Sequence, residues 1–184
     1  EESETGTVVY AGSAVAIVVA DETITLDIPL SPVVPLLRFV PSYVQLLDDS
    51  TFVLDTRIYN LDSLFGISFR VWWPDGFPLR VDSAQPGGDV NSPSIIFFAQ
   101  PGTGPYHTFS ITQTGAGEAI VDSTGAAHLA RIFCTVQDFF SVMSSRIDIT
   151  VEPTGLTGVD STTIPLGVLY TDDCMLEVGA SAGP

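Results

Sequence analysis

Lysine is absent from this sequence of 184 residues, and its six basic residues are all arginines. With 22 acidic residues, the formal net charge is -16 at pH 7. Because contacts to phosphate groups need Lys and Arg, this balance argues against nucleic acid and anionic membrane surfaces as partners. The acidic excess suits a solvated surface, divalent cations or a salty medium that screens self-repulsion, and composition does not separate these three.

Catalytic motifs are also missing. The only histidines, His107 and His128, lie in no nucleophile motif, so we expect them to be strand-end or surface imidazoles. No Gly-Lys-Ser/Thr follows the glycines of residues 102–104, which therefore do not form a phosphate-binding loop. Most carboxylates fall in expected turns, where they are solvated. We therefore expect a protein that is not an enzyme.

Cysteine occurs only twice, as Cys134 and Cys174, both on expected strands. Neither a CxxC motif nor a Cys/His cluster with zinc spacing is present, which disfavours zinc. The two residues are either reduced, buried thiols or partners in one disulfide, and an extracellular location would favour the disulfide.

A hydrophobic run long enough to cross a bilayer is lacking as well. The longest, Thr7–Ala20, has about fourteen residues and no basic residues before it, so we expect neither a membrane span nor a signal peptide. Its five valines and one isoleucine favour a strand, and both faces of that strand are apolar. Such a strand needs cover on both sides.

The clearest pattern in the chain is strict alternation of apolar and polar residues. Alternate residues from Phe52 to Ile58 point one way within Thr51–Tyr59, and Phe65 to Trp73 repeats the pattern after a polar turn. Pro74-Asp75-Gly76 stops the second run. We interpret the two runs as a hairpin whose apolar face requires a second layer, which predicts an all-β antiparallel sandwich.

Prolines divide the chain into three parts. Residues 1–30 form an extended N-terminal strand arm, 31–35 a proline-stiffened linker that is poor at pairing, and 36–184 the sandwich body. In the body, Ile95–Ala99 reads as a fully buried strand because its apolar run is continuous, and 82–94 reads as a loop. Further strands are expected at Leu36–Val40, Tyr43–Leu47, Tyr106–Thr112, Ala119–Val121, Leu129–Val136, Arg146–Val151, Thr162–Tyr170 and Cys174–Val178, with a short helical turn at Asp138–Ser144.

Two segments of the body resemble cohesin domains. Trp73-Pro74-Asp75-Gly76-Phe77-Pro78-Leu79-Arg80-Val81 is similar to the family's Y-D-P-x-x-L-x-V segment with Pro and Asp exchanged, and Ala127–Val136 is similar to its L-A-x-I-x-F-x-V strand. The resemblance covers roughly Leu36–Val178. It implies a jelly-roll, cohesin-like sandwich and a module that holds a dockerin through one sheet face. Outward aromatics such as Tyr59 and Trp72 could serve that partner or a carbohydrate.

The arm suggests a second function, that of a structural subunit of an extracellular filament or tube. A strand donated to the next copy, head to tail, would build a homopolymer. This combination resembles the donor-strand subunits of archaeal filaments and tubes, including the cannula-type proteins, in which calcium assists assembly. The alternative is that the arm forms the first strands of its own sandwich. The expected donor residues are Val8, Val9, Tyr10, Val15, Ile17, Val18, Val19, Ile24 and Leu26.

Adjacent carboxylates at strand ends are the candidate calcium ligands, because hard cations take oxygen donors from loops. These are the pairs Asp48-Asp49 and Asp172-Asp173. Plain solvated acids are the alternative. The family resemblance and the acidic exterior together favour an extracellular or cell-surface location, with the cargo or glycan partner left open.

Overall fold

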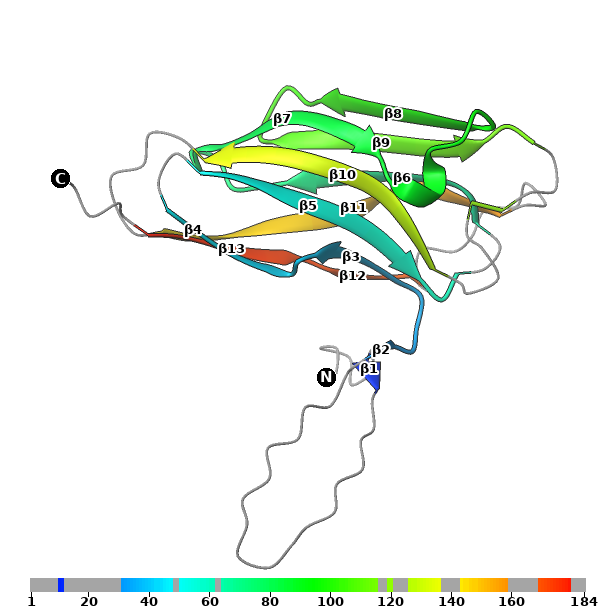
Figure 1. The fold of residues 1–184 in the computed structure, drawn as a ribbon, viewed down its shortest axis with the longest axis horizontal. Helices are drawn as coiled ribbons and strands as arrows, with labels where there is room; N and C mark the ends of the chain where they lie inside the picture. Colours follow the sequence, from blue (N-terminus) through cyan, green and yellow to red (C-terminus); the bar gives the residue numbers. More distant parts are fainter. Residues whose placement is uncertain are drawn as a thin grey trace, which may run out of the picture.

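The computed structural model describes residues 10–11, 31–47, 50–61, 64–115, 119–120, 126–136, 143–158 and 169–179. Within these ranges all regular structure is β-strand except one 3-10 turn (Figure 1). The elements are β1 (Tyr10–Ala11), β2 (Ser31–Pro32), β3 (Leu36–Val40), β4 (Tyr43–Leu47), β5 (Thr51–Tyr59), β6 (Leu64–Trp72), β7 (Leu79–Pro86), η1 (Gly88–Val90), β8 (Ile95–Pro101), β9 (Tyr106–Gln113), β10 (Ala126–Val136), β11 (Met143–Gly158), β12 (Tyr170–Asp172) and β13 (Cys174–Gly179).

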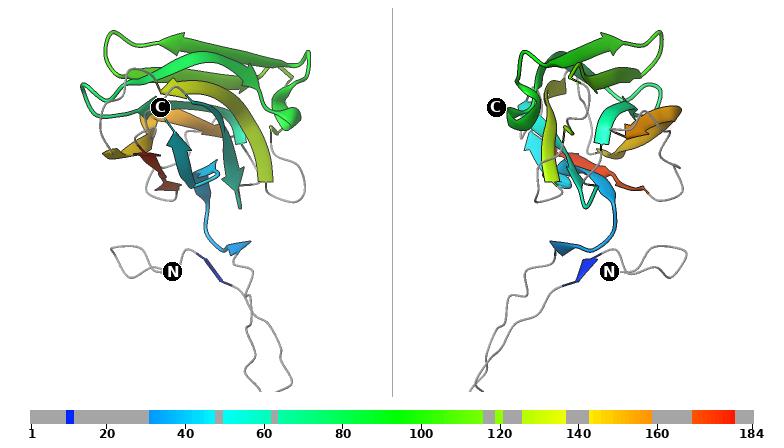
Figure 2. Two further views of the ribbon diagram at one scale, coloured as in Figure 1. Left: turned by 60° about the vertical axis from the view of Figure 1, so that its left-hand side comes forward. Right: turned by 90° about the vertical axis from the view of Figure 1, so that its right-hand side faces the viewer.

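Two sheets pack face to face and enclose the core (Figures 1 and 2). The five-stranded sheet has the order β12-β3-β5-β10-β7, and the six-stranded sheet has the order β4-β13-β11-β6-β9-β8. The predicted all-β sandwich is therefore confirmed. Two pairs depart from the antiparallel expectation, because β12 runs parallel to β3 and β13 runs parallel to β4.

The predicted hairpin is wrong, although both of its strands are right. β5 begins and ends where the alternation places it, and β6 lies one residue earlier than the predicted run from Phe65 to Trp73. However, β5 belongs to the five-stranded sheet and β6 to the six-stranded sheet. The chain leaves the five-stranded sheet after Tyr59 and enters the six-stranded sheet at Leu64. Asn60, the first residue of this connection, has a positive φ of 55°. The apolar faces of the two strands therefore cover each other across the sandwich, rather than lying side by side and needing cover from elsewhere.

The prediction for β8 is wrong in its burial. Ile96 and Phe98 are exposed, while Ile95 and Phe97 pack against the core. β8 belongs to a two-layer sandwich, so only one of its faces meets the other sheet. The continuous apolar run of this strand therefore leaves one apolar face exposed to solvent, at the edge of its sheet. The predicted loop 82–94 is also shorter than expected, because β7 continues to Pro86 and η1 follows.

Ser31–Pro32, at the start of the linker, is paired rather than free. β1 and β2 form a two-stranded sheet that lies apart from the sandwich (Figures 1 and 2). The side-chain amide of Asn60 donates to the carbonyls of Pro32 (2.9 Å) and Val34 (3.1 Å), which ties the linker to the body. Of the expected donor residues only Tyr10 belongs to the described part; those outside it are Val8, Val9, Val15, Ile17, Val18, Val19, Ile24 and Leu26.

Candidate functional site

The outer face of the six-stranded sheet carries most of the exposed large hydrophobic side chains among the described residues. Of the seven large hydrophobic side chains that are exposed, five lie on strands of this sheet and point away from the core. Monomeric soluble proteins seldom leave such side chains grouped on one face unless that face binds something. The five are Tyr43 (49% exposed), Trp72 (40%), Ile96 (57%), Phe98 (50%) and Met175 (43%).

Polar groups in the middle of this face satisfy one another. The hydroxyls of Ser68 and Ser110 are 2.6 Å apart across β6 and β9. The guanidinium of Arg70 lies 5.1 Å from the ring centroid of Tyr106, and its Nε is 2.5 Å from Glu152. Because these groups already have partners, a ligand could cover them without leaving a buried charge unpaired.

A hollow of about 400 Å³ lies beside Trp72 on the same face, lined also by Arg146, Asp148 and Asp173. Arg146 bridges the two carboxylates, with its Nε 2.8 Å from Asp148 and a second contact to Asp173. Burial, and then the neighbouring Asp173, raise the pKa of Asp148. One arginine therefore pairs with two carboxylates beside Trp72 on the outer face of the six-stranded sheet.

The predicted calcium ligands are only partly described. Asp48 and Asp49 lie outside the described residues. Asp172 is 3.7 Å from Arg38 on the five-stranded sheet, whereas Asp173 pairs with Arg146 and accepts the backbone N–H of Ile149 (3.0 Å). Adjacent in sequence, the two carboxylates thus serve different sheets. Within the described ranges, no three His, Cys, Asp or Glu side chains are grouped so that they could hold a metal. Calcium binding remains a prediction.

Cys134 and Cys174 are both buried free thiols, on β10 and β13 of opposite sheets. Burial is the main cause that raises the pKa of each thiol to about 12. The neighbouring Cys174 also raises the pKa of Cys134, and both residues belong to the core between the sheets. The structure contains no disulfide between them, and the disulfide remains a prediction.

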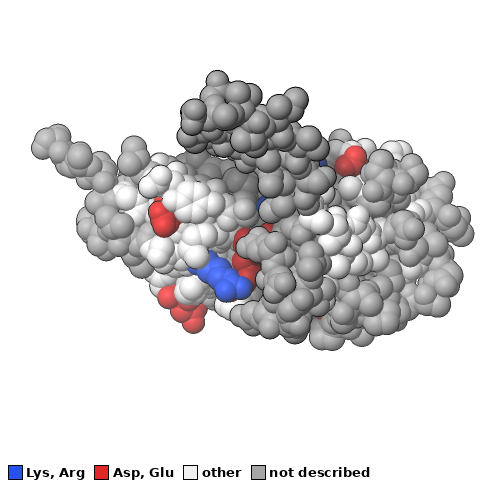
Figure 3. Space-filling model, turned by 90° about the horizontal axis from the view of Figure 1, so that it is seen from below, with Lys and Arg blue, Asp and Glu red and all other residues white. Residues whose placement is uncertain are grey.

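Arginine side chains pair with carboxylates on both sheets. Seen from below the view of Figure 1, basic surface lies directly beside acidic side chains (Figure 3). On the five-stranded sheet Arg131 donates two hydrogen bonds to Asp55, of 2.9 and 3.1 Å. The Arg131 guanidinium is the main cause that lowers the pKa of Asp55.

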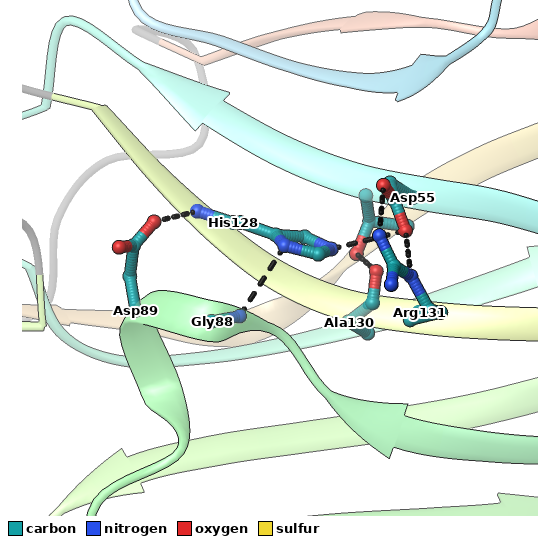
Figure 4. Close-up of polar contacts among 7 residues, drawn as sticks. Asp55, Gly88, Asp89, His128, Ala130 and Arg131 are labelled. Carbon is teal, nitrogen blue, oxygen red and sulfur yellow. Dashed lines mark hydrogen bonds and ion pairs between the residues drawn. The ribbon is translucent and has the colours of Figure 1, made fainter.

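His128 lies in β10 at the centre of a polar cluster that the sequence does not reveal (Figure 4). The backbone N–H of Gly88 donates to its Nδ1 (3.2 Å), and its own backbone N–H donates to Asp89 (2.7 Å). Its Nε2 lies 3.1 Å from Asp55 Oδ1 but makes no hydrogen bond. These contacts fasten η1 to β10. His128 lies near the start of β10 and its side chain is 11% exposed, which fits the expected strand-end imidazole rather than the surface one.

The two aromatics proposed as a shared binding face lie on different faces. Trp72 points outward from the six-stranded sheet, whereas Tyr59 is half-buried on β5 of the other sheet. Sequence alternation shows that each points away from the core, but it does not show which sheet the strand joins. For the same reason the sequence did not predict the other exposed residues on the outer face of the six-stranded sheet, which are Tyr43, Ile96, Phe98 and Met175.

Comparison with known proteins identifies the fold. No family model and no curated protein sequence matches the chain. Solved structures do: a non-cellulosomal cohesin from the archaeon Archaeoglobus fulgidus has a TM-score of 0.59 at 14% identity, covering 79% of this chain and 89% of that one. The likeness shows a cohesin-like β-sandwich.

Two bacterial cohesins support the same conclusion. The cohesin of a type I cohesin–dockerin complex from Clostridium thermocellum has a TM-score of 0.63 at 12% identity, covering 87% of this chain and 99% of that one. The seventh ScaB type I cohesin from Pseudobacteroides cellulosolvens has a TM-score of 0.62 at 14% identity, covering 81% and 94%. At such identities the likeness defines the fold class and leaves the partner open. No helix among the described residues is long and apolar enough to cross a membrane.

Proposed function

We propose that this chain is an extracellular protein-interaction module that binds a dockerin-type partner through the outer face of its six-stranded sheet. The observation that carries the proposal is the grouping of five exposed large hydrophobic side chains on that face. The fold supports it, because the Clostridium thermocellum cohesin of similar structure was solved bound to a dockerin.

The arrangement of the face fits a folded protein better than a small ligand. Ile96 and Phe98 lie on β8 at one edge, Tyr43 and Met175 are paired neighbours on β4 and β13 at the other, and Trp72 is between them. Contacts on four strands that reach both edges of the sheet need a partner as wide as the sheet. Aromatic and large aliphatic side chains around satisfied polar groups are typical of the residues that carry most of the energy in such interfaces.

The test is calorimetric titration of the full chain with a panel of purified dockerin modules. We expect at least one to bind, and the double variant Ile96→Ser/Phe98→Ser to weaken that binding at least tenfold because two exposed apolar anchors are lost. Val53→Ser is the matched control, since Val53 is also exposed (38%) but lies on β5 of the other sheet. Equal binding by the double variant, or no binding to any dockerin, would refute the proposal.

We also propose a second candidate function, that of a subunit of a homopolymeric filament or tube. Its copies would assemble by exchange of the N-terminal arm, and calcium would assist the assembly. It is supported by the pairing of β1 with β2 outside the sandwich, because Tyr10 and Ala11 contribute no strand to either sheet of their own body. The body has a core of its own without them.

Electron microscopy and size-exclusion chromatography distinguish the two functions. If the arm polymerises the protein, the full chain forms filaments or tubes, more readily with calcium, and a chain that begins at Leu30 remains monomeric. Monomers of the full chain at high concentration with calcium, or polymers of the shortened chain, would exclude arm exchange.

A further inference from the structure

Arg57 is the one arginine of the chain for which the structure shows no carboxylate partner among the described residues. Each of the other five has its Nε close to a carboxylate. The pairs are Arg38–Asp172 (3.7 Å), Arg70–Glu152 (2.5 Å), Arg80–Asp82 (2.6 Å), Arg131–Asp55 (2.9 Å) and Arg146–Asp148 (2.8 Å). In a chain with 22 acidic and six basic residues, an unpaired arginine is unexpected.

The position of Arg57 makes this absence costly. Its Nε is buried and has no hydrogen-bond acceptor. On β5 it is directly opposite Arg38 of β3 on one side and His128 of β10 on the other, so three nitrogen-bearing side chains form a row across three strands. Like charges directly opposite each other in a sheet are destabilising, and a buried donor without an acceptor costs further free energy.

A hollow of about 150 Å³ opens at this row, and Arg57, Tyr59, Asp89 and His128 line it. The Asp89 carboxylate accepts the backbone N–H of His128 at 2.7 Å, and Arg57 Nε has no hydrogen bond to it. The hollow is large enough for one small anionic group, and Arg57, whose Nε lacks an acceptor, lies at its wall.

We propose that the Arg57 hollow binds a single carboxylate group. A planar guanidinium holds a carboxylate through two parallel hydrogen bonds, which would satisfy the buried Nε and offset the repulsion within the row. A carboxylate is favoured over a phosphate because the nearby Asp89 and the net charge of -16 oppose a doubly charged ion more strongly than a singly charged one.

The site is separate from the proposed dockerin face, since Arg57 lies on the five-stranded sheet and the face belongs to the six-stranded sheet. The carboxylate could belong to a small free acid or to an acidic side chain of another protein. Both sources supply the same group, so the experiment below compares them.

Arginine side-chain NMR tests the site directly. The full chain has six arginines, so six Nε–Hε signals are expected, and the one lost in Arg57→Gln is assigned to Arg57. At pH 7.5, where inorganic phosphate is mostly doubly charged, and at constant ionic strength, sodium acetate should move the Arg57 signal along a saturable curve with half-saturation on the order of 10 mM. The Arg70 signal should not move in this way. Arg57→Gln should remove the response while the other five signals stay in place, and Arg70→Gln should retain it.

Three further titrants identify the ligand class. Acetyl-glutamate amide should also shift Arg57, and its glutamine counterpart should not. If acetyl-glutamate amide saturates at a concentration at least tenfold below acetate, the natural carboxylate is carried on a polypeptide; if the two are equal, a small free acid is sufficient. Inorganic phosphate saturating below acetate would overturn the choice of a carboxylate. A linear shift shared by all six signals, or none, would overturn the site.

Discussion

Asp55 shows how one carboxylate organises the outer face of the five-stranded sheet. Arg131 donates two hydrogen bonds to it, and His128 Nε2 lies 3.1 Å away. These charged contacts favour the ionised carboxylate, and the Arg131 guanidinium above all lowers the pKa of Asp55 from its ordinary 3.8. A lowered acid pKa stabilises the fold above the unfolded-state pKa, and this contribution is lost as the pH falls through the folded-state pKa.

Asp55→Asn should therefore lower the free energy of unfolding at pH 7 by about 1 kcal/mol, a modest value because Arg131 is half exposed and screened by solvent. The difference from the unmodified chain should shrink below pH 3.8 and vanish once Asp55 is protonated in the folded state as well. Urea unfolding at pH 7 and at successively lower pH measures it. A difference that stays constant with pH would show that the charge of Asp55 is not the cause.

The two thiols give a second prediction at this scale. With burial raising the pKa of Cys134 and Cys174 to about 12, only about one thiol in ten thousand is ionised at pH 8. Both should therefore be unreactive toward a disulfide reagent in the folded protein. In urea without reductant, two reactive thiols per chain would agree with the structure, and none would show that the predicted disulfide forms.

At the scale of elements, η1 is fixed to β10 through closely packed backbone. The N–H of Gly87 donates to the carbonyl of Leu129 (3.0 Å), and a methyl group at Gly87 would overlap the carbonyl of His128. A methyl group at Gly88, in contrast, would meet no atom within 4 Å. The turn can therefore approach the strand only where residue 87 has no side chain.

Gly87→Ala should lower the free energy of unfolding by about 1–3 kcal/mol, because the backbone must move to admit the methyl group. Gly88→Ala, one residue further along the turn, should be close to neutral, since its methyl group meets nothing within 4 Å. Thermal and urea unfolding of the two variants gives the comparison. Equal stabilities would mean that the contact between η1 and β10 is looser than the structure shows.

For the whole molecule, charge is the dominant feature. The net charge of -16 is spread over a chain whose described arginines are mostly already paired. Self-repulsion of that size opposes the compact state, and salt reduces it. Exposed salt bridges weaken in salt too, but each is worth little.

Raising NaCl from 20 mM to 500 mM should therefore raise the Tm, since the Debye length falls from more than 10 Å to less than 8 Å over this range. KCl should have the same effect. A calcium salt at equal ionic strength should raise the Tm further only if the chain binds calcium, as the acidic pairs predict. A Tm that falls with NaCl would mean that the arginine–carboxylate pairs outweigh the general repulsion.

Local alternation determined much of this protein. β3, β4 and β5 begin and end where the sequence places them. Except at the start of β6, where Leu64 rather than Phe65 is fully buried, the inward residues of β5 and β6 are the ones that the period of two selects. This agreement has a simple cause. Strand formation and the side that faces the core depend on neighbouring residues, which the sequence displays directly.

Only the tertiary structure decided which strand joins which sheet. That assignment separated β5 from β6, placed β8 at an edge with Ile96 and Phe98 exposed, and put Trp72 and Tyr59 on opposite faces. It also aligned Arg57 between Arg38 and His128, residues 19 and 71 positions away. Such neighbours arise from pairing between distant segments, and a period of two carries no information about that pairing. The outer face of the six-stranded sheet and the Arg57 hollow therefore form only in the folded molecule.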